Sequence, residues 1–481
     1  MTGLPTVWGS TITVKASSAS PDADPVWVDL SDYVTFREGD LQTDTGQQTD
    51  LDETAEPSVA RLAWRNDNHE FTDSAGLFPW FKEARRVRVE ETIGAQTFCL
   101  FDGYLGPPTQ VPLVDTSAAP PVAFLTTAAT AADRLSRLRN SRAFISTLTE
   151  YVRNAGRATL QSYWPLLDPA GSSTFTNVVG DAAPMSAAGV SVEPALTTAL
   201  FTESEFITPA VGPVAFTDDR SPVQFAVDLG TSGGVLNATR WRTLKGSPSI
   251  TCNTNTVTLV FWVYPDVTRS LVPAGFSPCG LTNFNTQHTA GTQADIELFC
   301  DSTGTTWTAD FYVNGAFVDL TPPALRTNAW NLVSLSMTLP SGDCTAYVHN
   351  MGSVSGNIAG APASATFTQI FAGARTEGSV SHVQVYLGPY TQATHDAQLA
   401  AALTGLQRQT TGERVNTILD YANVPAAIRD VDPGVAVMST ASLAGKDPLT
   451  LLEEARRTER GRLFMADGRL KFHDRRRVFN V

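Results

Sequence analysis

The sequence predicts a mainly β protein with some α structure, in which a split β-rich scaffold is interrupted by an inserted β-sandwich. A chain of 481 residues is too long for one ordinary domain. Residues 160–405 carry 7 Lys+Arg and 17 Asp+Glu, a net charge of −10, whereas the flanking residues carry 27 and 31, a net charge of −4. Short β-periodic segments fill the middle, and helical patterns return near the end. We therefore predict scaffold parts at residues 1–158 and 407–481, and an insert at 159–406.

The N-terminal part alternates apolar and polar residues, as strands do, before it changes to a helical pattern. The predicted strands lie at residues 6–15, 26–30, 58–65, 85–90, 98–101, 111–115 and 123–127. Residues 38–57 are acidic and rich in Gln and Thr, which predicts a loop. Residues 131–139 place Leu135 and Leu138 on one face, which predicts a helix.

The middle of the chain has many short β-periodic segments separated by turn signals such as Asn314-Gly315. Regular spacing of this kind is typical of a β-sandwich. The clearest predicted strands lie at residues 223–229, 256–264, 294–300, 308–313, 330–339, 345–349 and 379–387, followed by a short helix at 394–403.

The last segment combines helices with a hairpin. Residues 414–422 place Val415, Ile418 and Leu419 on one helical face, and Asp447 with Pro448 begins a second helix at 447–455. Apolar stretches on both sides of Asp467-Gly468 predict a β-hairpin.

Charge and hydropathy exclude several classes of protein. The net charge of −14 argues against a nucleic-acid binder. No run of about 18 apolar residues exists, so we expect no membrane-spanning segment, and the N-terminus lacks the pattern of a secretory signal. The five cysteines match no zinc spacing. We expect buried reduced thiols, with one or two disulfides among Cys252, Cys279, Cys300 and Cys344 as the alternative if the protein acts outside a cell.

A set of short motifs lies in the two flanks, over about residues 1–158 and 407–481. These motifs are Trp27-Val-Asp-Leu-Ser-Asp-Tyr-Val34, Arg61-Leu-Ala-Trp-Arg-Asn-Asp-Asn68 with Phe71-Thr72, Pro79-Trp-Phe-Lys82, Arg86-Val-Arg-Val89, Phe101-Asp-Gly-Tyr104, Asp133-Arg-Leu135, and a closing region at 413–422, 453–458 and 463–475. With this set the flanks resemble actinobacterial minor tail proteins of long-tailed phages, the siphophages.

This resemblance implies a structural virion protein of the tail tip, the baseplate hub, assembled in the host cytoplasm. Such a hub would associate with itself as a ring, expected to be a homotrimer, and with other tail-tip, distal-tail and fibre proteins. The long central insert departs from the usual pattern. A related injection machine or gene-transfer particle would use the same hub, and the sequence does not separate the two.

The insert contains a second set of motifs. Its segments are Tyr163-Trp-Pro-Leu-Leu-Asp168, Thr258-Leu-Val-Phe-Trp-Val-Tyr264, Phe311-Tyr-Val-Asn-Gly315, Ala329-Trp-Asn-Leu-Val-Ser334 and Thr345-Ala-Tyr-Val-His-Asn350. These segments resemble the concanavalin A-like, laminin-G-type sandwich, or jelly roll. The resemblance implies that Trp164, Trp262 and Trp330 lie in the core. This architecture serves glycan binding, protein binding and glycanase chemistry alike, so a host cell-surface glycan or another tail protein is the expected ligand.

The sequence argues against catalysis. Laminarinase-like enzymes of this fold carry their carboxylates on one strand, and the closest match here is Gln293-Ala-Asp295-Ile-Glu297. Gln293 stands where the nucleophile should be, and an amide cannot form the glycosyl-enzyme intermediate as a carboxylate does. We therefore predict no catalytic residues and no enzyme. Asp295 and Glu297 are interpreted as a solvated strand face, with a residual metal or sugar contact as the alternative.

Four residues are candidates for ligand contacts. Trp241 and Trp307 follow polar or turn segments, and either ring could stack on a sugar or anchor a loop. Asp301 and Asp343 could hold a calcium ion or serve only as turn residues. No cofactor is predicted apart from this optional calcium. The alternative function is a secreted lectin or glycanase of the concanavalin A-like fold.

Overall fold

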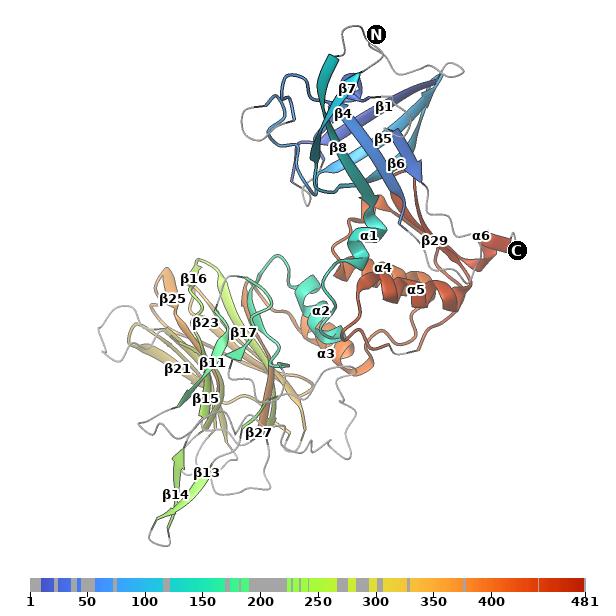
Figure 1. The fold of residues 1–481 in the computed structure, drawn as a ribbon. Coiled ribbons are helices and arrows are strands. Elements are labelled where there is room, and N and C mark those ends of the chain that lie inside the picture. The colour runs from blue at the N-terminus through green and yellow to red at the C-terminus, as the bar shows by residue number, and fades with distance from the viewer. Residues whose placement is uncertain are drawn as a thin grey trace. The chain divides into compact units, whose positions relative to one another are not determined.

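The computed structural model divides the chain into two compact units (Figure 1). One is discontinuous and comprises Met1–Phe144, Leu406–Ser439 and Gly445–Val481; the other comprises Ile145–Gly405 with Thr440–Ala444. The structure describes residues 10–20, 25–35, 41–44, 57–71, 76–115, 122–168, 174–180, 183–189, 223–225, 228–232, 235–240, 242–265, 276–282, 294–300, 306–326, 329–374, 378–439 and 441–479. Within these residues no helix is long and apolar enough to cross a membrane.

The first boundary lies between Phe144 and Ile145, before the position predicted from the sequence, which was after residue 158. The reason is helix α2 (Thr147–Ala155), which the sequence analysis missed. Leu148 and Val152 of this helix are buried in one apolar cluster with Trp262 of the sandwich. The helix therefore belongs with the sandwich, although it precedes the segment where the β pattern begins.

The discontinuous unit begins with an eight-stranded antiparallel sheet. Its strand order is β2-β1-β5-β6-β8-β4-β3, with β7 paired to β8. The strands and the short 3-10 helix η1 are β1 (Ser10–Ser17), β2 (Trp27–Asp29), η1 (Ser31–Tyr33), β3 (Leu41–Asp44), β4 (Val59–Arg65), β5 (Arg86–Ile93), β6 (Gln96–Leu105), β7 (Thr109–Asp115) and β8 (Val122–Asp133).

This sheet curls around a single core and closes only partly into a barrel. Apolar residues from near both edges, Leu30 and Leu41 among them, contact the same cluster around Trp64. In the described residues the two ends meet through an isolated bridge between Val34 and Trp64, supported by the Thr35 N–H, which donates to the Ala63 carbonyl at 2.9 Å. The unit is therefore a sheet bent nearly into a barrel.

The helix predicted at residues 131–139 begins later than expected. Strand β8 continues through Ala131 and Ala132, which pair with β4, and helix α1 spans Arg134–Arg139. The Asp133 carboxylate caps the helix by accepting from the N–H groups of Leu135 and Ser136. An alanine-rich segment favours a helix in isolation, but pairing with a neighbouring strand overrides that preference here.

The C-terminal part adds helices and a small sheet in the order β28-β30-β29. Its elements are α4 (Thr411–Tyr421), η2 (Ala426–Ile428), β28 (Arg429–Val431), α5 (Pro448–Glu459), β29 (Arg462–Ala466), β30 (Arg469–His473) and α6 (Arg475–Phe479). The predicted cap of α5 is present, with Asp447 ahead of Pro448. Thr410 and Glu413 also form a capping box for α4, which was not predicted from the sequence. Both predicted helices and the hairpin are confirmed.

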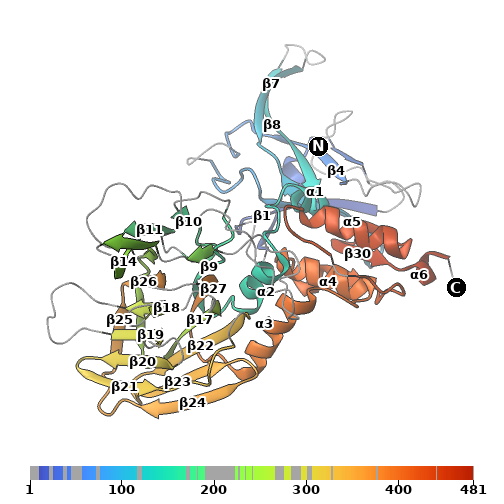
Figure 2. The same ribbon diagram turned by 90° about the horizontal axis from the view of Figure 1, so that it is seen from below.

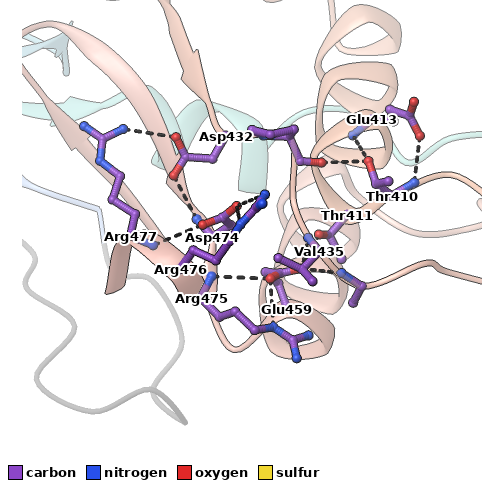
Figure 3. Close-up of polar contacts among 12 residues, drawn as sticks. Thr410, Thr411, Glu413, Asp432, Val435, Glu459, Asp474, Arg475, Arg476 and Arg477 are labelled. Atoms are coloured by element: carbon purple, nitrogen blue, oxygen red, sulfur yellow. Dashed lines mark hydrogen bonds and ion pairs between the residues drawn. The ribbon is translucent and has the colours of Figure 1, made fainter. Parts of the chain in front are cut away.

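A buried carboxylate ties this part together (Figure 3). Glu459 is fully buried and accepts hydrogen bonds from the Thr411 hydroxyl at 2.5 Å, the Val435 N–H at 3.0 Å and the Arg475 Nε at 3.0 Å. Burial alone would raise the pKa of Glu459, but these donors outweigh it and lower the pKa to about 2. The ionised carboxylate thus joins helices α4 and α5 to the end of the hairpin.

Asp102 joins the two sequence-distant parts of the unit. Both oxygens of this buried carboxylate accept from Arg86 Nη2 at 2.9 Å, and its Oδ2 accepts from Arg88 Nε at 2.8 Å. The turn of the C-terminal hairpin lies against this group: at Gly468, which has a φ of +71°, a Cβ would come within 3.2 Å of Asp102 Oδ2. Arg86 is itself only 7% exposed, so it depends on Asp102 for its counter-charge.

The second unit is a β-sandwich (Figure 1). One sheet has eight strands in the order β10-β11-β15-β26-β18-β19-β20-β21, and the other has seven, β12-β27-β17-β22-β23-β24 with β9 paired to β27. Two small two-stranded sheets, β13-β14 and β16-β25, complete the described strands. The strands are β9 (Leu160–Trp164), β10 (Thr174–Phe175), β11 (Met185–Gly189), β12 (Val223–Phe225), β13 (Asp228–Ser232), β14 (Val235–Arg240), β15 (Arg242–Gly246), β16 (Ile250–Asn253), β17 (Thr256–Pro265), β18 (Phe276–Thr282), β19 (Ala294–Cys300), β20 (Trp307–Val313), β21 (Ala316–Leu320), β22 (Asn331–Thr338), β23 (Asp343–Val348), β24 (Gly352–Asn357), β25 (Ser364–Phe367), β26 (Gln369–Ala374) and β27 (Gly378–Leu387).

The seven-stranded sheet is buried on both faces. Along β17, Leu259 and Phe261 point into the core between the sheets, whereas Val260 and Trp262 point into a second core under helices α2 and α3 (Gln392–Thr404). This explains why residues 259–264 form an unbroken apolar run instead of alternating. Trp164 and Trp262 are fully buried, as the family resemblance implies, and Trp330 is half-buried. All five cysteines lie in the described residues, and no disulfide joins any two of them.

Helix α3 brings a histidine into an apolar site. His395 is 1% exposed, and neither ring nitrogen has a hydrogen-bond partner among the described residues. Its ring lies edge-on to Tyr347 at 4.4 Å and parallel to His349 at 5.8 Å between centroids. Burial, followed by the proximity of His349, lowers the pKa of His395 to about 3. Asp396 lies 3.5 Å from His349 and has the opposite effect on that ring.

The Asp102 cluster yields a stability prediction. Asp102→Asn leaves the buried Arg86 without a full counter-charge, so we expect the free energy of unfolding of the discontinuous unit to fall by about 3–5 kcal/mol. The matched control is Asp67→Asn, whose partner Arg65 has a side chain that is 63% exposed, and which should cost less than about 1 kcal/mol. Urea unfolding of the full-length chain compares the two variants. Similar losses in both would contradict the assigned role of Asp102.

His395 yields a prediction about pH. Because its folded pKa lies near 3 and its ordinary value is 6.5, the unfolded chain binds a proton more readily between these two values. His395 therefore contributes no pH dependence above pH 6.5, and below it this residue alone should lower the free energy of unfolding of the sandwich by about 1.4 kcal/mol per pH unit. His395→Phe keeps an aromatic ring and removes this titration, so the melting temperature of the wild-type chain relative to the variant should fall as the pH is lowered below 6.5. Parallel pH profiles for both proteins would refute this explanation.

Candidate functional site

The candidate site is the outer face of the eight-stranded sheet, over strands β18 to β21 (Figure 2). Successive side chains on a strand point to opposite faces. In β20, Trp307, Ala309, Phe311 and Val313 are buried in the core, so Asp310 and Tyr312 face outward. The same alternation turns Asp295 and Glu297 of β19 outward, because Ala294, Ile296 and Leu298 are core residues.

The strand register arranges these outward residues in two rows. In one row Thr282, Asp295, Tyr312 and Phe317 lie side by side on four neighbouring strands. In the next row the neighbours are Gly280, Glu297, Asp310 and Asp319. Residues that are directly opposite in an antiparallel pair share one face, with their Cβ atoms about 5 Å apart. Four carboxyl groups and two aromatic rings therefore share one patch, called the acidic face below.

Asp295 is the most deeply placed of these carboxyl groups. It is 8% exposed, and its Oδ1 has no hydrogen-bond partner within the part of the chain that the structure describes. Burial, followed by the charges of Glu297 and Asp310, raises the pKa of Asp295 to about 8. The sequence-based interpretation of Asp295 as part of a solvated face is therefore wrong, because the neighbouring strands exclude water from it. At neutral pH this side chain is mostly protonated and can donate a hydrogen bond.

The second row places like charges opposite one another. Asp310 of β20 is directly opposite Glu297 of β19 on one side and directly opposite Asp319 of β21 on the other. Burial, followed by Asp319, raises the pKa of Asp310 to about 6. Like charges that face each other across strands destabilise a sheet by about 0.2–1 kcal/mol per pair. The acidic face contains two such pairs, so its composition is not the one that stability of the fold alone would favour.

Aromatic rings border the acidic face on both sides. Phe317 on β21 is 68% exposed and directly opposite Tyr312. On the other side, the Phe371 ring of β26 covers Gly280: a Cβ at that glycine would lie 2.3 Å from the ring. An exposed phenylalanine beside carboxylates offers a flat apolar surface next to hydrogen-bonding groups, which is the composition of sites for polar ligands with apolar faces.

The tryptophans proposed for sugar contact are not part of this face. Trp307 begins β20 but is only 4% exposed, because its position in the alternation points it into the core. The expectation that its ring stacks on a sugar is therefore wrong, and the alternative of a locally packed anchor is correct. Trp241 and Gln293 lie outside the described residues.

The proposed calcium residues are not brought together by the described part of the structure. Asp343 is exposed at the start of β23, where its carboxylate accepts from Asn357 Nδ2 at 3.0 Å. Hydrogen bonds from Ser341 and Asn357 lower the pKa of Asp343, as expected for a turn residue. Asp301 lies outside the described residues, and within them no group of three or more His, Cys, Asp or Glu side chains could hold a metal ion.

Sequence analysis missed Asp310, Tyr312, Phe317 and Asp319 as site residues, although a signal for them exists. The turn Asn314-Gly315 is a two-residue hairpin loop, so Val313 must pair with Ala316 and the other pairs follow. The pairing of this hairpin with Asp295 could not be derived in the same way, because the sequence between β19 and β20 has no two-residue turn motif that would fix the register.

The comparisons with known proteins give only remote likenesses. No protein-family model and no curated protein matches the sequence. The similar solved structures include the botulinum neurotoxin serotype D binding domain (9% identity, 53% of this chain and 55% of that chain covered, TM-score 0.33) and a mutant of Trypanosoma rangeli sialidase displaying trans-sialidase activity (12%, 72% and 51%, 0.30). A heptameric SAP-like pentraxin from Limulus polyphemus is similar at 14% identity, with 37% and 80% covered and a TM-score of 0.27. The chain thus spans about half the length of the neurotoxin binding domain, and at these TM-scores the ligand must be argued from the residues of this chain itself.

Proposed function

We propose that the protein is a structural subunit of a phage tail tip, in which the discontinuous unit forms the hub scaffold and the sandwich presents a binding face for host-surface glycan. The observation that carries the scaffold role is the meeting of three tail-protein-like motifs at one point. Arg86-Val-Arg-Val89, Phe101-Asp-Gly-Tyr104 and the hairpin at Asp467-Gly468 come together at Asp102.

Physical constraints explain the residues of these motifs. Gly103 lies so close to β8 that a Cβ would come within 2.4 Å of the Ala132 carbonyl oxygen. Gly468 has a left-handed backbone and lies against Arg88 and Asp102. The motifs that resemble tail proteins are thus the residues that hold the scaffold together, which supports the assignment of the scaffold to that family.

The binding role of the sandwich rests on the acidic face. It combines exposed aromatic surface with carboxyl groups, and it lies on the sheet opposite the one covered by helices α2 and α3. In this proposal the hub forms a ring, expected as a homotrimer, contacts other tail-tip, distal-tail and fibre proteins, and needs no cofactor. The protein is then a virion component without enzymatic activity.

A glycanase is the second candidate, because the acidic face contains a protonated carboxyl group, Asp295, near other carboxyl groups. Such a pair can act as an acid and a base. The amide at Gln293, where related enzymes have their nucleophile, counts against it. Hydrolysis of a glycan that disappears in Glu297→Gln, while the variant still folds, would favour this candidate over the structural role.

The scaffold role predicts the composition of purified particles. In particles from the natural source of the sequence, mass spectrometry should detect peptides from both scaffold parts and from the sandwich in one chain, together with other tail proteins. Chemical cross-linking of the same particles should give closed oligomers, with a trimer expected. Recovery of the chain only as a free monomer, absent from particles that are otherwise complete, would refute the proposal.

A further inference from the structure

The charge arrangement of the acidic face identifies the kind of ligand that it would favour. Asp310 has acidic neighbours on both sides, Glu297 and Asp319, at directly opposite positions. Among the residues described, neither Asp310 nor Asp319 forms a salt bridge with a lysine or an arginine. A cationic group placed here would relieve the repulsion within the row, whereas a neutral ligand would leave it in place.

Asp295 supplies a second, independent indication. Its Oδ1 is buried without a partner among the described residues and lies beside Glu297 and Asp310. A buried polar atom without a hydrogen-bond partner is unfavourable until a ligand supplies one. A ligand with several hydroxyl and amino groups would give this oxygen a partner and pair with the neighbouring carboxylates at the same time.

The aromatic border restricts the ligand further. Phe317 of β21 is directly opposite Tyr312 of β20. Two residues along the same strands, and on the same face, Asp319 is directly opposite Asp310. A ligand bound across both rows would thus contact ring surface and carboxylates within a few ångströms. A pyranose that carries an amine fits this requirement, because it has an apolar C–H face and an ammonium group on one small ring.

We propose that the acidic face binds a glycan that carries free amino groups, with the sugar ring against Tyr312 and Phe317 and the ammonium groups among Glu297, Asp310 and Asp319. This inference rests on the glycan-binding role proposed for the sandwich. It deepens that role by naming the charge of the ligand, and it requires no metal ion.

The test compares two probes that differ only in acetylation. Calorimetry with the full-length chain at neutral pH, above the pKa of about 6 of Asp310, measures binding of a glucosamine hexamer and of the matching N-acetylglucosamine hexamer. The glucosamine hexamer should bind at least about tenfold more tightly, with an affinity that falls as salt is added. A chelator should leave this affinity unchanged.

The variants separate the charge from the fold. Asp310→Asn removes a charge that the ammonium group would contact, so it should weaken binding of the glucosamine hexamer about tenfold or more. Because the same charge is repelled by its neighbours, the melting temperature should stay equal or rise. Phe317→Ala should weaken binding of both hexamers. Asp343→Asn, which changes an exposed carboxylate on the other sheet, is the matched control and should leave the affinity for both hexamers unchanged.

Several outcomes would overturn the inference. Equal affinity for the two hexamers would show that the face binds glycan without recognising the amino groups. A hexalysine peptide that binds as tightly as the glucosamine hexamer, with no effect of Phe317→Ala, would indicate a cationic protein partner. Loss of binding with a chelator would indicate a metal-mediated site. Failure of both hexamers to bind overturns the inference, whereas the scaffold role is decided separately by the composition of the particles.

Discussion

The architecture of this protein depends on joining two chain segments that are separated by the whole sandwich. Asp102 makes that junction: it holds Arg86 and Arg88 on adjacent strands and lies beneath the turn at Gly468. A buried arginine with one carboxylate partner is costly unless that partner stays in place. The contact at Gly468 thus places the last hairpin of the chain against a charge cluster that the first sheet has to keep.

The two sheets of the sandwich differ in how their outer faces are covered. Helices α2 and α3 cover the outer face of the seven-stranded sheet, so that β17 is apolar on both sides. The eight-stranded sheet alternates instead, with core residues on one side and polar residues on the other. The polar side could have been filled with neutral or mixed charges. Instead it carries carboxyl groups directly opposite one another. Because this arrangement is less stable than a neutral or mixed one, it is the basis for assigning the face a function.

Much of the fold could be predicted from the sequence, because strand alternation and turn chemistry are local. The hairpin at Asp467-Gly468, the capped start of α5 at Asp447 and the continuous strand β17 all follow from short patterns. The errors arose where distant pairing outweighed local preference. Ala131 and Ala132 favour a helix but extend β8 because β4 pairs with them. Helix α2 was missed although Ser146 has the chemistry of a helix cap.

The candidate site shows the same division. The sequence by itself determined that this is a multidomain, mainly β chain with an acidic insert, and that Asp295 and Glu297 share one strand face, since side chains alternate along any strand. Only the tertiary structure decided that Trp307 points into the core and that Asp310 and Asp319 lie beside Glu297. The reason is that register between strands depends on how loops close and cores pack, and those are properties of the whole fold. A charge becomes informative only when its neighbours across the sheet are known.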